Sequence, residues 1–168
     1  YDRAEELFLS LAGSGREPAV ALSHLVRTYE IQHAWQQAAD AHKRLRNVGV
    51  PEQPAAIAHF YCEMAEAAIA AQDYRRAIEH LDSATREQHD FGRSAILRGD
   101  LARRQGDPGL ALQLYRSVIR RDFHLLALVL PRLADAAKQA GEPQQFDEAL
   151  EELVRNGVGN PAEIAYAA

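Results

Sequence analysis

The residues in this sequence that could perform chemistry are sparse and form no recognisable catalytic or metal-binding motif. His59 and Glu63 stand four residues apart, so they would share one helix face, but no second histidine completes a metal site. Cys62 is the only cysteine, which leaves no internal disulfide and no cysteine-based zinc site, and we interpret it as a packed thiol. There is no nucleophile motif and no glycine-rich phosphate loop, so the sequence favours a protein that is not an enzyme and needs no cofactor here.

Charged side chains are unevenly distributed along the chain, whose formal net charge is −5. Acids dominate between residues 142 and 155, whereas arginines dominate between residues 92 and 121. Arginine binds carboxylates through two parallel hydrogen bonds, so the second stretch is a candidate dock for an acidic segment, with an ordinary solvated face as the alternative. The net negative charge argues against nucleic acid as the main partner. The arginines are Arg93, Arg98, Arg103, Arg104, Arg116, Arg120 and Arg121.

A repeat of 34 residues provides the elements that must position these side chains. Small residues recur at this step, from Ala65 to Gly99 and from Ala77 to Ala111, and Leu81 falls onto Tyr115. A period of this length with small residues at fixed places in two helices is typical of tetratricopeptide repeats. The small residues let two helix backbones approach, and larger apolar residues one turn on, Ile78 and Leu81 among them, are expected to fill the space beside them. Because one hairpin cannot bury its own apolar face, neighbours must stack.

The repeat predicts an all-α, right-handed superhelix, an α-solenoid that extends over residues 1–168 and is truncated at both ends. Residues 1–12 are expected to form the second helix of a repeat, and residues 160–168 to begin a further helix. Gly106, Asp107 and Pro108 predict a helix end, an N-cap and a first-turn proline in sequence, and Gly141 predicts a second helix end of the same kind. Pro131 predicts either a kink or a late start of the helix that ends before Gly141. The sequence has no apolar run of membrane-spanning length. Helix pairs are predicted at residues 18–50, 56–91, 92–124 and 125–156.

Solenoids of this kind bind partners along the face formed by their first helices. The acidic residues Glu66 and Asp100 fall where repeats that clamp a free C-terminal carboxylate place lysine and asparagine, which disfavours such a clamp. The mixed polarity of the face predicts a polar peptide or protein surface as partner, with a wet, charged face as the alternative. The predicted groove residues are Ser23, Arg27, Glu30, His59, Cys62, Glu66, Ile69, Arg93, Ile96, Asp100, Arg103 and Arg104.

Three short stretches resemble the lipopolysaccharide assembly protein B family of Gram-negative bacteria. They are YDRAEELF at residues 1–8, WQQA at residues 35–38 and AHFYCE at residues 58–63. Repeat positions account for Ala38 and Ala65 but not for the HFYCE run, so the resemblance goes beyond the repeat pattern. It covers most of the chain, including the long connector near Pro51.

The resemblance implies a non-catalytic adaptor with an N-terminal membrane helix, a cytoplasmic repeat array at the inner-membrane face and a C-terminal rubredoxin-like zinc module. Its implied partners are a membrane-bound AAA+ protease and the deacetylase of the lipid A pathway, whose degradation the adaptor promotes. Neither the membrane helix nor a pair of CxxC motifs occurs in this sequence, so membrane attachment and zinc binding are assigned to no residue.

Two other functions stay open at this point. One is a generic tetratricopeptide-repeat scaffold for another envelope or secretion assembly, since the repeat pattern alone names no partner. The other is an enzyme whose site follows no known motif. Self-association of the array also stays open.

Overall fold

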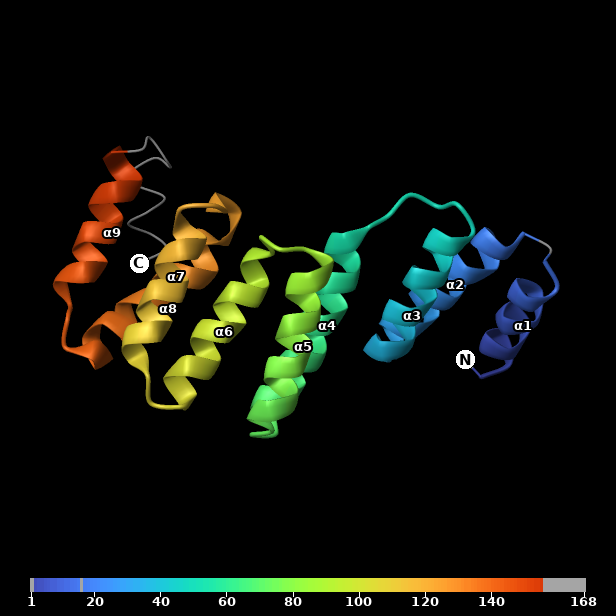
Figure 1. The fold of residues 1–168 in the computed structure, drawn as a ribbon, viewed down its shortest axis with the longest axis horizontal. Coiled ribbons are helices and arrows are strands. Elements are labelled where there is room, and N and C mark those ends of the chain that lie inside the picture. The colour runs from blue at the N-terminus through green and yellow to red at the C-terminus, as the bar shows by residue number, and fades with distance from the viewer. Residues whose placement is uncertain (1, 16, 156–168) are drawn as a thin grey trace. The chain divides into compact units, whose positions relative to one another are not determined.

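The computed structural model describes residues 2–15 and 17–155, which are built from α-helices joined by short turns (Figure 1). No strand occurs in this part of the chain, so the all-α prediction is confirmed. The chain divides into two compact units, Tyr1–His89 and Asp90–Ala168, which are described separately. The handedness of a superhelix that extends over the complete array therefore stays a prediction. The further helix expected at residues 160–168 lies outside the described residues.

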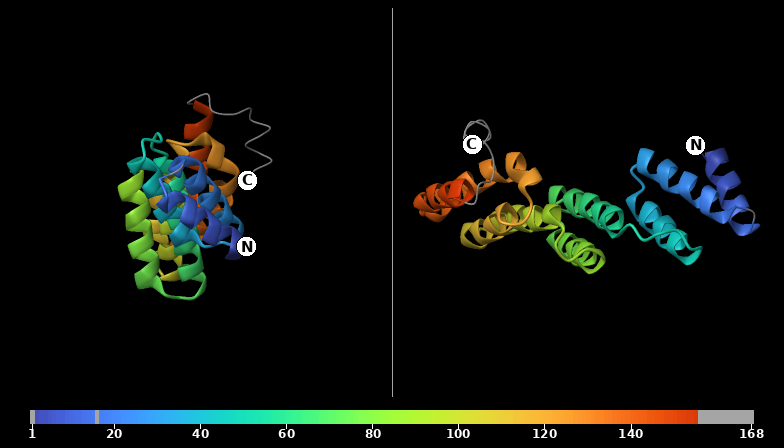
Figure 2. Two further views of the ribbon diagram at one scale, coloured as in Figure 1. Left: turned by 90° about the vertical axis from the view of Figure 1, so that its right-hand side faces the viewer. Right: turned by 90° about the horizontal axis from the view of Figure 1, so that it is seen from above.

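The first unit consists of one helix and two antiparallel helical hairpins. Helix α1 (Asp2–Gly13) packs against α2 (Pro18–Ile31), which pairs with α3 (Trp35–Asn47). Helix α4 (Pro54–Ala70) pairs with α5 (Tyr74–Glu87), and α3 packs against α4, so the hairpins stack within the unit (Figures 1 and 2). The expected connector near Pro51 separates α3 from α4.

The second unit contains α6 (Gly92–Arg104), α7 (Pro108–Ile119), the 3-10 turn η1 (Phe123–Leu125), α8 (Leu126–Ala140) and α9 (Gln144–Arg155). Helix α7 packs against both α6 and α8. A late start at Pro131 is wrong, because α8 begins at Leu126 and continues through the proline. Proline removes only one ladder hydrogen bond at this place, and its ring is exposed.

Four hairpin turns close in the same way. In each, one residue adopts a left-handed conformation, and the next amide donates to a carbonyl five residues earlier, which is the Schellman arrangement that satisfies the last carbonyls of a helix. The glycines predicted two of these turns, at Gly106 and Gly141. The other two place His33 and Gln72 at φ values of 54° and 60°. The closing distances are 2.8 Å from Ala34 N to Tyr29 O, and 2.9 Å from Asp73 to Ala68, Asp107 to Ala102 and Glu142 to Ala137.

Aspartates cap the second helices of two hairpins, as the sequence predicted for Asp107. Its carboxylate accepts a hydrogen bond from the amide of Leu110 at 2.9 Å, and that of Asp73 accepts from Arg76 at 3.1 Å. Each carboxylate satisfies an amide that has no partner within the helix. Sequence-local chemistry therefore fixes where α5 and α7 begin.

Small residues at the repeat positions lie inside the units. Ala65, Ala77 and Ala111 are 0% exposed. A Cβ built on Gly99 would lie 2.3 Å from Cε1 of Tyr115, so the α6–α7 crossing admits no side chain there. The predicted helix crossings are thus confirmed in register. One predicted core residue is wrong: Ile78 is 40% exposed, because the buried stripe of α5 follows Ala77, Leu81 and Ala84 and leaves the next position outside.

Candidate functional site

The predicted groove residues of the first unit differ in their exposure. On α2, Arg27 is exposed and Glu30 is half-buried; on α4, Glu66 is exposed and His59 is half-buried. Their charges are of both signs, as the sequence predicted. These four side chains therefore lie at least partly at the surface, where a partner can reach them.

Three of the predicted groove residues are corrected, because their side chains are buried. Cys62 is 0% exposed, and Ile69 and Ile96 are each 4% exposed. Ile96 belongs to the apolar core that α6, α7, α8 and α9 share. An apolar side chain gains free energy when it leaves water, so these residues pack between helices and leave the groove face to their polar neighbours. The burial of Cys62 agrees with the packed thiol that the sequence predicted.

An aromatic seam lies beside His59. The rings of Trp35 and Phe60 stack at a centroid separation of 6.0 Å, and His33 and His59 meet Trp35 edge-on at 5.1 and 6.3 Å. His42 completes the seam at 5.8 Å from Phe60. Burial lowers the pKa of His42, and the nearby charge of Glu30 opposes this shift only in part, so this imidazole is neutral at pH 7.

Lys43 joins the two hairpins of the first unit. Its Nζ donates a hydrogen bond to the hydroxyl of Tyr61 at 2.9 Å and forms an ion pair with Glu87 at 3.1 Å. Partial burial acts to lower the Lys43 pKa, but the hydrogen bonds with Tyr61 and Glu87 outweigh it and raise the pKa. This lysine is part of the packing of α3 against α4 and α5.

In the second unit, charged residues of α6 and α8 pair across the two helices. Arg132 Nε donates to the two carboxylate oxygens of Asp100 at 3.1 and 3.2 Å, and the hydroxyl of Tyr115 donates to Asp100 at 2.7 Å. Arg103 pairs with Asp135 at 3.6 Å. Burial, followed by the hydrogen bond to Asp100, raises the pKa of the Tyr115 hydroxyl, which stays protonated. Two of the predicted groove residues, Asp100 and Arg103, are therefore engaged by the protein itself.

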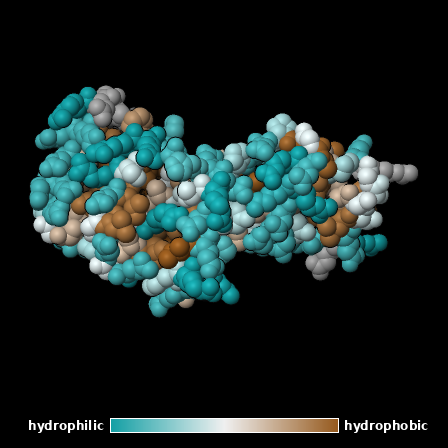
Figure 3. Space-filling view, viewed as in Figure 1, coloured by the Kyte–Doolittle hydropathy of each residue, from teal (hydrophilic) through white to brown (hydrophobic). Residues whose placement is uncertain are grey.

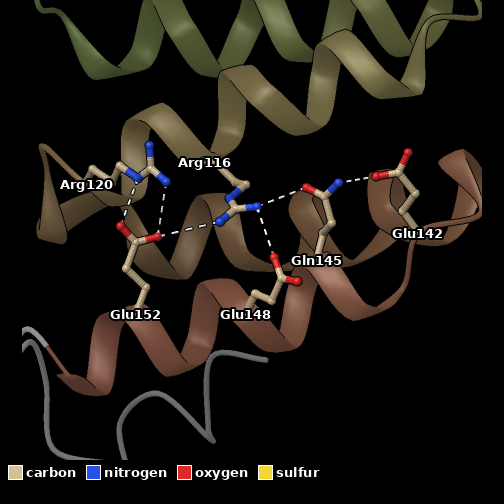
Figure 4. A network of polar contacts seen from close by, with 6 residues as sticks. All are labelled: Arg116, Arg120, Glu142, Gln145, Glu148 and Glu152. Atoms are coloured by element: carbon tan, nitrogen blue, oxygen red, sulfur yellow. Dashed lines mark hydrogen bonds and ion pairs between the residues drawn. The ribbon is translucent and has the colours of Figure 1, made fainter.

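The arginine cluster is engaged further by acids of the same unit. Arg116 lies 3.6 Å from both Glu148 and Glu152, and Arg120 Nε donates to Glu152 at 3.0 Å (Figure 4). Arg121 pairs with Asp90 at 2.8 Å. Of the remaining predicted groove arginines, Arg93 is half-buried and Arg104 is exposed. Much of the predicted dock for an acidic segment is thus occupied by acids of this chain.

Hydrophilic residues cover most of the face shown in Figure 3, with apolar areas between them. In the described part of the chain, no group of three or more histidine, cysteine or acidic side chains is placed to hold a metal ion. Within the same residues, no helix combines the length and apolar character needed to cross a membrane.

The chain is similar to curated proteins over nearly its whole length. Lipopolysaccharide assembly protein B from Escherichia coli K12 is 31% identical to it over 167 residues, which are 99% of this chain and 43% of that protein. The predicted relationship to lipopolysaccharide assembly protein B is confirmed. The proteins of the same name from E. coli O6:H1 and O157:H7 match equally. The chain spans less than half the length of these relatives, and no family model matches it.

Sequence reasoning missed the partners of the groove charges. Arg132 and Asp135 were not predicted, although each lies 32 residues after its partner on α6. This constant offset, close to the repeat length, is the signal that could have found them. It places opposite charges side by side on the first helices of two successive hairpins.

Proposed function

We propose that this chain is the protein-binding repeat segment of a non-catalytic adaptor that acts in lipopolysaccharide assembly. The observation that supports this most is the 31% identity to lipopolysaccharide assembly protein B over 99% of the chain. The paired, stacked helices and the mixed charges on α2, α4 and α6 fit contacts with other proteins.

The resemblance also suggests how the adaptor acts. In this proposal it works at the cytoplasmic face of the inner membrane and brings the deacetylase of the lipid A pathway to a membrane-bound AAA+ protease. The exposed groove residues are then candidate contacts with these proteins, Arg27 and Glu66 in the first unit and, separately, Arg104 in the second. Polar contacts of this kind contribute more to specificity and to the association rate than to affinity.

A segment exchange tests the proposal. The matching 167 residues of E. coli lipopolysaccharide assembly protein B are replaced by this chain, and the half-life of the deacetylase is measured by pulse-chase in cells that carry only the chimera. We expect the chimera to restore a short half-life, whereas a protein with the segment deleted does not.

Two further variants of the chimera make the test specific. Reversing Arg27, Glu66 and Arg104 together should lengthen the half-life of the deacetylase, because an interface with like charges opposed is weakened. Reversing Arg75, whose side chain is 80% exposed on α5, is the control and should change nothing. A chimera that accumulates to normal levels but leaves the deacetylase stable would overturn the proposal.

A further inference from the structure

Helix α9 contacts the C-terminal end of α7 through ion pairs in addition to apolar side chains. Glu148 and Glu152 lie one helical turn apart and face Arg116 in the last turn of α7 and Arg120, the residue that caps it (Figure 4). Arg120 donates two hydrogen bonds to Glu152, at 3.0 and 3.2 Å. Arg116 also donates to Gln145 at 2.9 Å, and Gln145 donates to Glu142. The two helices therefore match in register as well as in charge.

The apolar part of this contact is small and incompletely packed. Ala149 and Leu153 are the buried side chains of α9, whereas Val154 is 55% exposed. A small pocket of about 30 Å³, open to solvent, lies beside Ile119, Phe123, Ala149 and Leu153, and its lining also includes Arg116, Arg120 and Glu152. Phe123 is 48% exposed. Phe146 and Leu150 are half-buried against the same core. The carboxylates of Glu148 and Glu152 are 60% and 34% exposed, so salt screens the ion pairs that supplement this packing.

We propose that Arg116, Ile119, Arg120 and Phe123 form a docking surface for an acidic amphipathic helix of a partner protein, which binds in exchange for α9. We call these four residues the α7 docking surface. Its requirements are read from α9 itself: two acids four residues apart, each followed by an apolar residue. The inference rests on the proposed function only in that the chain binds proteins.

The open pocket beside Ala149 could give a partner helix an advantage over α9. At the position of Ala149, a larger apolar side chain would fill the empty space beside Ile119 and Phe123. That side chain would displace water from the pocket and bury further apolar surface, while the two ion pairs are conserved. A partner helix with leucine at this position should therefore compete with the resident helix, although α9 has the benefit of being tethered.

A labelled peptide provides the probe. It consists of residues 143–155 with Ala149→Leu, and its binding to the whole chain is measured by fluorescence anisotropy. In the chain variant Glu148→Lys/Glu152→Lys, α9 is repelled by Arg116 and Arg120. We expect this variant to bind the peptide about tenfold more tightly than the parent chain, which is the effect of two surface ion pairs. Raising NaCl from about 50 mM to about 500 mM should weaken binding.

Controls separate docking from unspecific attraction. A peptide in which both glutamates are lysine should not bind, and Arg116→Glu/Arg120→Glu in the chain should abolish binding of the acidic peptide. Arg75→Glu/Arg76→Glu is the matched control, because these arginines pair with acids of their own helix end and should leave peptide binding intact. Binding that the Arg116→Glu/Arg120→Glu variant retains would overturn the proposal.

Hydrogen exchange of the unaltered chain provides a second measurement that does not depend on the folding of any variant. Addition of the acidic peptide should speed the exchange of amides in residues 145–155 and leave those of α6 and α7 protected. Unchanged exchange of α9 at saturating peptide would contradict the exchange mechanism. Because these experiments use the purified chain, they can fail while the segment exchange succeeds, and the reverse.

Discussion

The α4–α5 hairpin of the first unit and the α6–α7 hairpin of the second use different residues at equivalent, crowded positions. The first pair of positions holds Ala65 and Leu81, and the equivalent pair holds Gly99 and Tyr115. In the second hairpin, α6 thus lacks the methyl group of alanine, and α7 carries a larger side chain, the ring of Tyr115, in place of leucine. The ring of Tyr115 occupies the place where a Cβ of residue 99 would lie.

The turns of the two hairpins also differ, and again only the second hairpin has glycine at the tight position. Gln72 closes the first turn at a φ of 60°, where a side chain is strained, and Gly106 closes the second at 83°, where glycine is not. A single hairpin geometry therefore tolerates two solutions, one with glycine at both tight places and one without. We infer that the repeat constrains the summed volume of the two side chains at a helix crossing rather than the identity of each residue.

Truncation of the two large residues should have the largest effect on stability. We expect Tyr115→Ala to lower the free energy of unfolding by about 3–5 kcal/mol and Leu81→Ala by about 2–5 kcal/mol, because both side chains are 0% exposed and each change leaves a cavity. Urea unfolding followed by circular dichroism measures this. A loss below about 1 kcal/mol in either variant would show that the crossings are not the main packing sites.

Overpacking of the equivalent alanines should affect the two hairpins alike. Ala77→Leu and Ala111→Leu introduce bulk where the native side chain is 0% exposed, and we expect each to cost roughly 1–3 kcal/mol. The melting temperature of each variant is the measurement. An unchanged value for either would contradict the shared register of the two hairpins.

Gly99→Ala tests the volume argument itself. The new Cβ would collide with the Tyr115 ring, so we expect a cost of about 1–3 kcal/mol from overpacking, reduced by the gain of about 1 kcal/mol when alanine replaces glycine in a helix. Gly99→Ala/Tyr115→Leu recreates the pair of the first unit. In a double-mutant cycle the two changes should compensate each other in part, and strict additivity would refute the volume argument.

Turn residues should show smaller effects of opposite sign. Gly106→Ala places a Cβ in a left-handed conformation and should cost about 1–2 kcal/mol, whereas Gln72→Gly removes such strain and should stabilise by up to about 1 kcal/mol. Chemical unfolding of both variants gives the comparison. Stabilisation by Gly106→Ala would mean that the backbone relaxes at this turn.

The smallest expected effect is a dependence on pH of the contact between α7 and α9. Hydrogen bonding from Arg120, with the charge of Arg116, lowers the pKa of Glu152 below its ordinary 4.5. The contact is therefore supported above pH 4.5 and loses this support as the pH falls through the lower value of the folded state. The NMR amide shift of Leu153 should follow this transition, and Glu152→Gln should abolish it. A transition that persists in the variant would assign it to another carboxyl group.

The contacts between the charged stretches could not be predicted from the sequence. An arginine-rich stretch and an acid-rich stretch were both evident, and the first was interpreted as a dock for an acidic segment. In the structure, Glu148 and Glu152 of the acidic stretch meet Arg116 and Arg120 of the basic one. Composition gives the sign of each stretch, but it does not reveal which one lies against the other, because they are separated by η1 and α8.

The helices, their capping aspartates and the small residues at their crossings could be predicted from the sequence. These depend on local periodicity, on capping carboxylates such as that of Asp107 and on side-chain volume, all of which follow from residues close together in the sequence. Which groove residues remain accessible depends instead on the folded arrangement of the helices. Burial of Cys62 and Ile96, and the pairing of Asp100 with Arg132, depend on how neighbouring helices meet, because desolvation and ion pairing are set by distances in space rather than by separation in sequence.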